Sequence, residues 1–436
     1  MESPLAASAD SRARDRRYAW WVVAMLWGVC FFNYADRQAI SAVSKPLQQE
    51  FGFSETQLGD IGSAFMWVYA LGAPFAGLIC DRFRRVHLIL GGCLFWSFIT
   101  LLTGACGEFW HFVAVRALEG LGETFYFPAS MALVSDYHSP ATRSRAMAIH
   151  QSSVYAGTIL GSAMGAWFAA HHGWRSGFYI FGGAGMLLAA VLYSFLREPQ
   201  RGASETSPVQ HKPRADAIPW TQSFRAVFRT RTALVLMLVF AGANAVAGVF
   251  LFWTPKFLIE KFHLTLTTAG LSGTVFIHLA SAVSVPLAGW GADWLSSRRA
   301  GGRLWVQCAG LLAGALFIAT VGLTQTQSTL LYAMVGFGLC KGLYDSGIFA
   351  SLYDVVTPEA RATAAGLMNT LGWLGGALGT KMAGWYADNG SYGSKIDNMS
   401  HYIAWGSAPY AAGGLLLLLV ALFWAKRDMP LARVAK

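Results

Sequence analysis

Long apolar stretches alternate with short polar segments along almost the whole chain. A helix needs about 20 predominantly apolar residues to cross the hydrocarbon core of a membrane. Twelve stretches of about that length are present, at roughly 18–46, 56–80, 87–107, 109–135, 144–170, 176–196, 232–256, 267–294, 303–324, 328–354, 361–387 and 405–425. The pattern predicts an all-α membrane protein with twelve transmembrane helices.

One long polar segment divides the apolar stretches into two groups of six. It covers residues 197–231 and contains Pro199, Pro208, Pro213 and Pro219 among serine, arginine and glutamate residues, which is typical of a linker. We therefore expect five parts: an N-terminal tail at 1–17, a six-helix bundle at 18–196, this linker, a second six-helix bundle at 232–425 and a C-terminal tail at 426–436.

The two groups also share short sequences at a constant separation. The segment Pro74-Phe75-Ala76-Gly77 with Asp81 recurs 212 residues later as Pro286-Leu287-Ala288-Gly289 with Asp293. Asp136, Pro140 and Arg143 recur 218 residues later as Asp354, Pro358 and Arg361. Two matches in the same order indicate a duplicated six-helix unit.

The composition and the placement of charge define the class of protein. Because 55% of the residues are hydrophobic and 13% are charged, a soluble core is excluded. The net charge of +10 does not indicate a nucleic-acid partner, because the basic residues gather in alternate loops. The opposite loops hold little more than Lys45, Arg175, Lys256, Lys261 and Lys395. The positive-inside rule therefore predicts an inner (plasma) membrane protein with both termini in the cytoplasm.

Motifs for other kinds of chemistry are absent from the sequence. The first apolar stretch is too long for a signal peptide and is expected to remain as a helix. The six cysteines are scattered without a CxxC pair, so we expect no metal site. The sequence has no GxxxxGK[ST], HExxH or GxSxG motif, so we expect neither an enzyme nor a bound cofactor. Energy for transport would then come from an ion or substrate gradient.

Charged residues nevertheless occur inside three of the apolar stretches. They are Asp36 and Arg37 in the first, Arg116, Glu119 and Glu123 in the fourth, and Lys341 and Asp345 in the tenth. Each would cost roughly 2.5–3.5 kcal/mol at the centre of an isolated helix, so pairing or a watery cavity must offset the cost. Either these residues are snorkelling or structural ion pairs, or they line a transport pathway that is coupled to protons.

The segment Gly77-Leu78-Ile79-Cys80-Asp81-Arg82-Phe83-Arg84-Arg85 resembles the signature loop of the major facilitator superfamily. The resemblance implies that the aspartate interacts with a neighbouring helix end and that the arginines hold a cytoplasmic gate. The expected gating residues are Gly77, Asp81, Arg82, Arg85, Arg143, Asp293 and Arg361. The alternative is that these basic residues only anchor the topology. Arg84 stands where this family usually has glycine.

A narrower resemblance links the chain to the anion:cation symporter branch, which includes sugar-acid transporters and sialin. Its residues are Asn33-Tyr34-Ala35-Asp36-Arg37, Phe65-Met66-Trp67-Val68-Tyr69-Ala70, the run from Arg116 to Glu123, and Gly173-Trp174-Arg175. The resemblance implies that Arg37 and Tyr69 contact a substrate carboxylate, that Asp36 and Glu123 carry protons, and that Arg116 pairs with whichever acid is ionised. Glu119 is either a second proton site or a partner for Arg116.

Three polar residues of the second group are further candidates for the substrate site. Lys341 and Asp345 lie four residues apart in one helix and either neutralise each other or take part in transport. In the latter case, Lys341 presents a second cation to a dianionic substrate or Asp345 joins the proton relay. Asn369 is expected to face the central cavity from the eleventh helix.

These features predict an alternating-access carrier with its site near the bilayer midplane. We expect a monomeric, proton-coupled symporter of a small organic anion, such as a sugar acid, whose partners are that anion, protons and membrane lipid. The alternative is a spinster-like, proton-linked transporter of a lysolipid or another amphipathic substrate. Gly122-Glu123 and Arg143-Ser144-Arg145-Ala146-Met147 resemble that branch nearly as well.

Overall fold

The computed structural model describes residues 4–200, 225, 227–357 and 360–428, and these residues form helices joined by short connections without a strand. Most of the expected linker and the end of the expected C-terminal tail lie outside this described part.

The first half contains eight described helices. They are α1 (Pro4–Ala42), α2 (Ser44–Phe51), α3 (Glu55–Arg82), α4 (Arg85–Thr103), α5 (Phe109–Glu123), α6 (Tyr126–Tyr137), α7 (Pro140–His172) and α8 (Trp174–Phe195).

The second half begins with α10 and ends with α18. Its elements are α10 (Arg231–Phe262), α11 (Leu266–Ser296), α12 (Gly302–Leu323), α13 (Gln327–Asp345), α14 (Ile348–Val355), α15 (Arg361–Asn389), α16 (Lys395–Trp405), α17 (Ser407–Leu419), a π-helical turn (Val420–Trp424) and α18 (Ala425–Asp428).

These helices correspond to twelve membrane spans. In each half the fourth span is broken, into α5 and α6 in the first half and into α13 and α14 in the second. Seven of the described helical segments are long and apolar enough to cross a membrane by length and composition alone. The pieces α5, α6 and α14 are too short for that test, and α3, α7, α13 and α15 do not meet its limits on hydropathy and charge.

Several ends differ from the sequence-based expectation. The first span ends at Ala42 rather than 46, and the separate helix α2 follows it until Gly52, whose φ of 68° ends the helix. Helix α10 continues through Pro255 to Phe262, beyond the expected end at 256. The last span begins with α16 at Lys395, ten residues before the expected start, because its first turns are polar.

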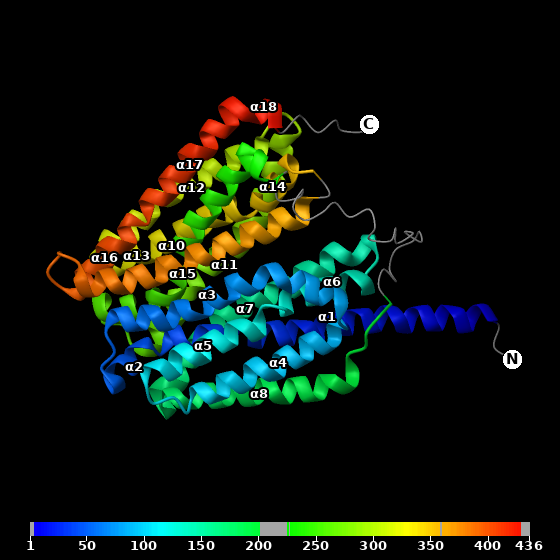
Figure 1. The fold of residues 1–436 in the computed structure, drawn as a ribbon, viewed down its shortest axis with the longest axis horizontal. Helices are drawn as coiled ribbons and strands as arrows, with labels where there is room; N and C mark the ends of the chain where they lie inside the picture. The colour runs from blue at the N-terminus through cyan, green and yellow to red at the C-terminus, as the bar shows by residue number, and fades with distance from the viewer. Residues whose placement is uncertain (1–3, 201–224, 226, 358–359, 429–436) are drawn as a thin grey trace.

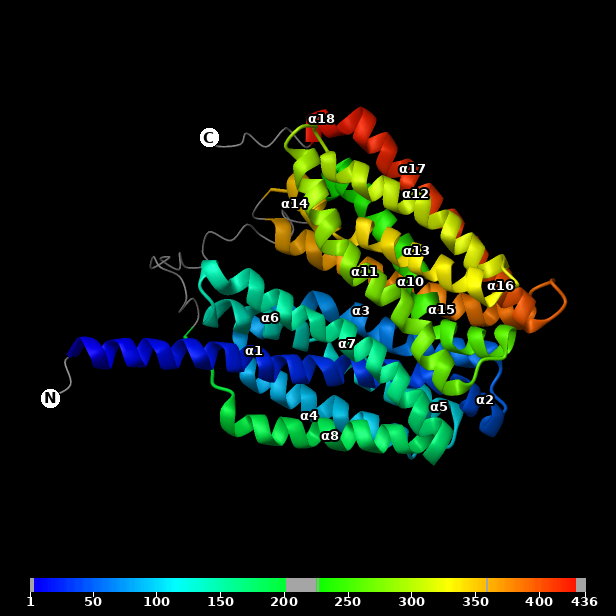
Figure 2. The same ribbon diagram turned by 180° about the vertical axis from the view of Figure 1, so that it is seen from behind.

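The two halves lie side by side and diverge toward one end of the molecule (Figures 1 and 2). The start of α1 and the final helix α18 lie at this end, which we call the terminal end. Helices α2 and α16 lie at the opposite end, which we call the far end. The main contacts between the halves are those of α3 with α15 and of α7 with α11.

The buried apolar residues confirm that the halves are joined at the far end. One cluster runs from the far end of the first half, through residues such as Phe53 and Phe112, into the second half, where it includes Trp253 and Phe337. A separate cluster around Leu26 and Trp96 holds the terminal end of the first half together. The hydrophobic core is therefore continuous across the halves only at the far end of the described structure.

Glycines set the close approach of α7 to α1. A methyl group at Gly161 would overlap the backbone of Ala35, whereas a methyl group at Gly183 in α8 would meet no atom within 4 Å. We expect Gly161→Ala to destabilise the protein by about 1–3 kcal/mol, as overpacking does. Gly183→Ala should leave stability unchanged or raise it, because alanine favours a helix.

The measurement is the thermal unfolding midpoint of both purified variants in detergent. Equal midpoints for Gly161→Ala and the unmodified protein would show that α1 and α7 are not held at this distance.

Candidate functional site

An ion pair between α1 and α5 forms the centre of the candidate site. The Nε and Nη2 atoms of Arg37 donate to Oε2 of Glu123 at 3.2 and 2.5 Å, and Nη2 also donates to the side-chain oxygen of Asn33 at 3.3 Å. The Glu123 side chain is fully buried and that of Arg37 is 13% exposed. A charge pair at this depth in the bundle is stable only with such direct contacts.

Aromatic rings surround the Arg37 guanidinium. Its central carbon lies 4.5 Å from the ring centres of Tyr34 and Phe65, 5.3 Å from that of Trp373 and 5.7 Å from that of Tyr69. These rings come from α1, α3 and α15, so both halves contribute to the cage. The ring faces stabilise a cation that has left water.

A second ion pair lies one turn away on α5. Arg116 Nη1 donates to Oε2 of Glu119, and both side chains are buried. The Thr100 hydroxyl lies 3.5 Å from Oε1 of Glu119, and the Phe65 ring lies 5.0 Å from the Arg116 guanidinium carbon. In this state the partner of Arg116 is Glu119, which was one of the two roles expected for Glu119.

Asp36 is the acid without a partner. It is 1% exposed, and neither of its carboxylate oxygens has a hydrogen-bond partner among the described residues. The hydroxyl of Thr100, which lies in the same region, donates instead to the carbonyl oxygen of Trp96 at 3.0 Å. Because a buried carboxylate without a partner is costly, a proton on Asp36 would lower the energy of this arrangement.

The structure therefore brings together most of the residues expected in the first half. Asp36, Arg37, Tyr69, Arg116, Glu119 and Glu123 all belong to this cluster. The sequence analysis missed Trp373 as a site residue, although its ring lies 4.4 Å from that of Tyr69. Asn369 is exposed and lies four residues before Trp373 on α15. Residues at this spacing share one face of a helix, so Asn369 and Trp373 lie on the same face.

A separate pair lies on α13 in the second half. Lys341 donates to Oδ2 of Asp345, and the two side chains are 26% and 34% exposed. Tyr155 of α7 and His278 of α11 lie nearby, with ring centres 6.4 Å apart. The pair Lys341–Asp345 is thus held within one helix and lies beside the boundary between the halves.

Ion pairs at the far end connect the two halves. Lys256 is bonded to Glu55, with both side chains buried. Further ties across the halves include Lys45 to Glu260 at 2.7 Å, Lys381 to Asp60 at 2.8 Å and the Thr56 hydroxyl to Asp388 at 2.8 Å. These contacts close the far end.

Glu50 of α2 shows the same kind of tie within the first half. Its carboxylate accepts hydrogen bonds from Arg175 at 2.7 Å and from the Trp174 ring nitrogen at 2.6 Å. The hydrogen bond from Arg175, followed by that from Trp174, lowers the pKa of Glu50.

The described ion pairs of Arg85 and Arg303, at the terminal end, stay within each half. Arg85 contacts Asp136 and, at 3.0 Å, Glu198. In the second half Arg303 contacts Asp293 at 2.7 Å and Asp354 at 2.5 Å. Arg303 was missed as a candidate, although the separation of 218 residues that relates Asp136 to Asp354 also relates Arg85 to Arg303.

The remaining gating candidates have simpler contacts. Arg143 donates to the carbonyl oxygen of His138 at 3.2 Å, and Arg361 donates to that of Tyr353 at 3.1 Å. Arg82 is exposed. The surroundings of Gly77 and Asp81 lie outside the described part, and their gating role stays a prediction.

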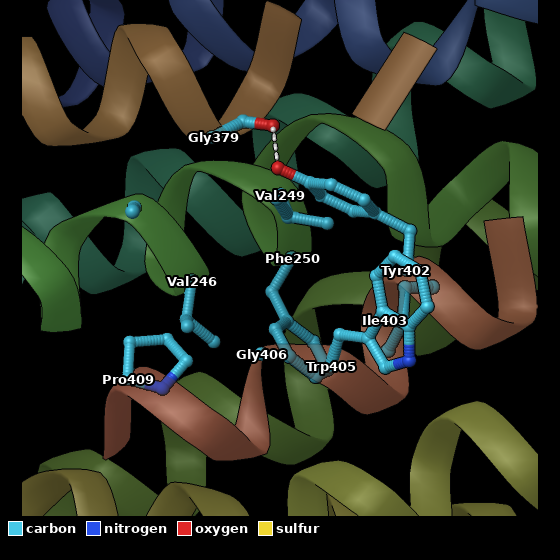
Figure 3. Close-up of a pocket in the computed structure, with 10 residues that line it drawn as sticks. Val246, Val249, Phe250, Gly379, Tyr402, Ile403, Trp405, Gly406 and Pro409 are labelled. Atoms are coloured by element: carbon cyan, nitrogen blue, oxygen red, sulfur yellow. Dashed lines mark hydrogen bonds between the residues drawn. The ribbon is translucent and has the colours of Figure 1, made fainter. Parts of the chain in front are cut away.

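One apolar cavity lies apart from this chemistry. It has a volume of about 170 Å³ between α10, α15 and the α16–α17 junction, and its lining is almost wholly apolar. Figure 3 shows Tyr402 reaching across it to donate to the carbonyl oxygen of Gly379 at 3.3 Å. Among the residues described, no group of three potential metal ligands occurs.

Comparison with known proteins finds a matching family model and relatives of two kinds. The family model described as Major Facilitator Superfamily matches residues 26–380. The chain is 27% identical to the chloroplastic ascorbate transporter of Arabidopsis thaliana, over 85% of this chain and 70% of that protein. It is 24% identical to the probable galactarate/D-glucarate transporter of Escherichia coli strain K12, over 86% and 87% of the two chains.

Relatives of a second kind match as well. The chain is 28% identical to the protein spinster of Drosophila melanogaster, over 80% of this chain and 58% of that protein. Among solved structures, a bacterial homologue of the human lysosomal transporter spinster, inward-facing and unoccupied, matches with a TM-score of 0.76 and 22% identity, over 94% and 98% of the chains. The predicted fold of twelve transmembrane helices in two six-helix repeats is confirmed.

The terminal-end pairs generate a stability prediction. Arg85 is 4% exposed and is bonded to two acids, whereas the adjacent Arg84 is exposed. Arg85→Gln removes a buried cation that is bonded to two acids and should destabilise the protein by about 3–5 kcal/mol, whereas Arg84→Gln should change stability little.

Thermal unfolding of the two purified variants at neutral pH gives the comparison. Midpoints that fall equally in both variants would show that the pairing of Arg85 does not hold the first half together.

Proposed function

The chain belongs to the major facilitator superfamily of transporters, and we propose that it is a proton-coupled symporter of a small organic anion. The proposed substrate is a carboxylate such as a sugar acid, and the proposed mechanism is alternating access of one central site. The observation that carries this proposal is the caged Arg37, whose counterion is an acid that can be neutralised by a proton.

The chemistry of Arg37 suits a carboxylate substrate. A guanidinium offers parallel N–H donors that match the two oxygens of a carboxylate. In the present state Glu123 occupies these donors, while its second oxygen, Oε1, is buried and has no hydrogen-bond partner among the residues that the structure describes. A proton on Glu123 removes the counterion of Arg37, and a substrate carboxylate can then take its place. Proton and anion therefore bind together.

Asp36 supplies the second proton site in this proposal. The cluster contains the three acids Asp36, Glu119 and Glu123 but only the two cations Arg37 and Arg116. With both ion pairs formed, Asp36 is the acid in excess, and its neutral form fits the buried setting best. If Arg116 turned from Glu119 toward Asp36, Asp36 would release its proton and Glu119 would take one up, so the site of the proton would follow the movement of the helices.

The arrangement of the halves supports alternating access. The described hydrogen bonds and ion pairs that join the halves lie at the far end or midway along the helices. At the terminal end, Arg85 and Arg303 each contact acids of their own half. The halves also diverge toward the terminal end (Figure 2). With both termini in the cytoplasm of a plasma-membrane protein, as the loop charges predict, this state is inward-facing.

A lysolipid or another amphipathic molecule is the second candidate substrate. Similarity to spinster and to a bacterial spinster homologue favours it. In that case Arg37 would contact an anionic headgroup, and the aromatic cage would contact the adjoining chain.

Transport into proteoliposomes tests the proton role. We expect the unmodified protein to accumulate galactarate, galactonate or ascorbate when the outside is acidic. Asp36→Asn and Glu123→Gln should abolish this accumulation but keep exchange of labelled for unlabelled substrate, because exchange needs no net proton movement. Arg37→Gln should lose both activities, because it lacks the carboxylate contact.

Full pH-driven accumulation by both acid variants would disprove proton coupling at these residues. Transport of lysolipid together with no transport of any carboxylate would replace the first candidate by the second.

Cross-linking tests the closed far end. The Thr56 hydroxyl and the Asp388 carboxylate are 2.8 Å apart in opposite halves, and the six native cysteines are buried. We expect the double variant Thr56→Cys/Asp388→Cys, bridged by oxidation or a short bifunctional reagent, to stop transport until the bridge is cleaved by a reductant.

The single variant Thr56→Cys, treated in the same way, is the matched control and should stay active. An active bridged double variant would show that the far end does not need to open.

A further inference from the structure

The pair of Lys341 and Asp345 has an unusual setting for an ion pair inside a membrane helix. It lies in the last turn of α13, directly before the break that separates α13 from α14. The neighbouring glycines Gly338 and Gly342 sit directly against α11, at Ile277 and Ser284, and so fix the rotation of α13.

The internal repeat relates this pair to the centre of the candidate site. The separation of 218 residues, which relates Asp136 to Asp354, places Lys341 at the position of Glu123. Asp345 lies one turn later and, like Glu123, is the last residue before the break of its span. Each half therefore holds an acid bonded to a cation at its helix break.

The pair is accessible, in contrast to the buried pair of Arg116 and Glu119 in the first half. Lys341 and Asp345 are 26% and 34% exposed, whereas Arg116 and Glu119 are 4% and 3% exposed. Lys341 also interacts electrostatically with Tyr155, which belongs to α7 of the first half. The exposed part of the pair therefore lies beside the boundary between the halves.

The surroundings of the pair contain no other group of fixed charge among the described residues. The titratable groups that interact with it are Tyr155 from α7, His278 from α11, Tyr344 from α13 and Tyr410 from α17. His278 directs Nδ1 to the carbonyl oxygen of Thr274 at 2.8 Å, so its Nε2 is not used in that contact. A proton on Asp345 would leave the charge of Lys341 without a counterion, and an anion would restore the balance.

We propose that Lys341 and Asp345 form a second carboxylate-binding site, which faces Arg37 and Glu123 from the other half and selects a dicarboxylate substrate. The inference rests on the proposed function, because it assigns the second end of the same substrate. One carboxylate binds Arg37 and the other binds Lys341, while Glu123 and Asp345 each take one proton. The dianion and the two protons then add no net charge to the site.

A dicarboxylate explains features that a monocarboxylate leaves without use. If Lys341 and Asp345 served only to neutralise each other, two apolar residues in their places would make the protein equally stable. The Tyr155 hydroxyl and His278 Nε2 have no hydrogen bond with another described residue, and both suit the hydroxyl groups of a sugar acid.

Binding of two matched ligands to the purified full-length protein tests the inference. Galactarate carries two carboxylates and galactonate carries one on a chain of the same length. We expect Lys341→Met to weaken galactarate binding by roughly 10-fold or more, the effect of losing a charge-assisted hydrogen bond, and to change galactonate binding by less than about twofold.

Two further variants separate binding from a structural role. Asp345→Asn imitates the protonated acid, so at pH 7.5 it should bind galactarate more tightly than the unmodified protein does at pH 7.5, and its binding should still tighten at pH 5.5 because Glu123 takes up a proton. The double variant Lys341→Met/Asp345→Asn removes both charges, and its binding of galactarate should remain weakened. A structural pair would instead predict recovery in the double variant.

Each other outcome counts against the inference. Equal weakening of both ligands by Lys341→Met, no weakening of galactarate, or recovery of galactarate binding in the double variant would overturn it while leaving the proposed function intact. If the unmodified protein binds neither ligand at either pH, the proposed function fails and the inference fails with it.

Discussion

The pairing of charges inside an apolar bundle is the constraint on which this structure depends. In the membrane interior an unpaired charge costs several kcal/mol, so each buried cation has to be placed against an acid or an aromatic face. Arg37 satisfies the rule with Glu123 and four aromatic rings, and Arg116 satisfies it with Glu119. Asp36 is left over, and this single excess acid is what gives the cluster a natural place for a proton.

The same constraint explains how the halves are held together. At the far end Lys256 and Glu55 come from opposite halves and bury each other's charge, and the hydrophobic core runs across the boundary there. At the terminal end Arg85 and Arg303 find their acids within their own halves. A change of state that opens the far end must therefore separate buried pairs, whereas the terminal end can part without breaking one of these ties.

The duplicated sequence gives each half a similar set of parts that the two halves use differently. The terminal-end pairs Arg85–Asp136 and Arg303–Asp354 follow the repeat with the same residue types. The broken spans α5–α6 and α13–α14 also correspond, but one carries Glu123 where the other carries Lys341. The repeat therefore preserves the framework, while the charges at the breaks differ between the halves.

The sequence by itself determined the membrane class, the twelve spans, the two repeats and the charged residues inside three of the spans, because hydrophobic length and the cost of charge in lipid are local properties. It also grouped Asp36, Arg37 and Glu123 through a family resemblance. It could not show that Trp373 completes the cage of Arg37, that Glu55 meets Lys256, or which acid Arg116 chooses. These pairings depend on how helices distant in the chain are rotated and packed, and only the tertiary structure decides that.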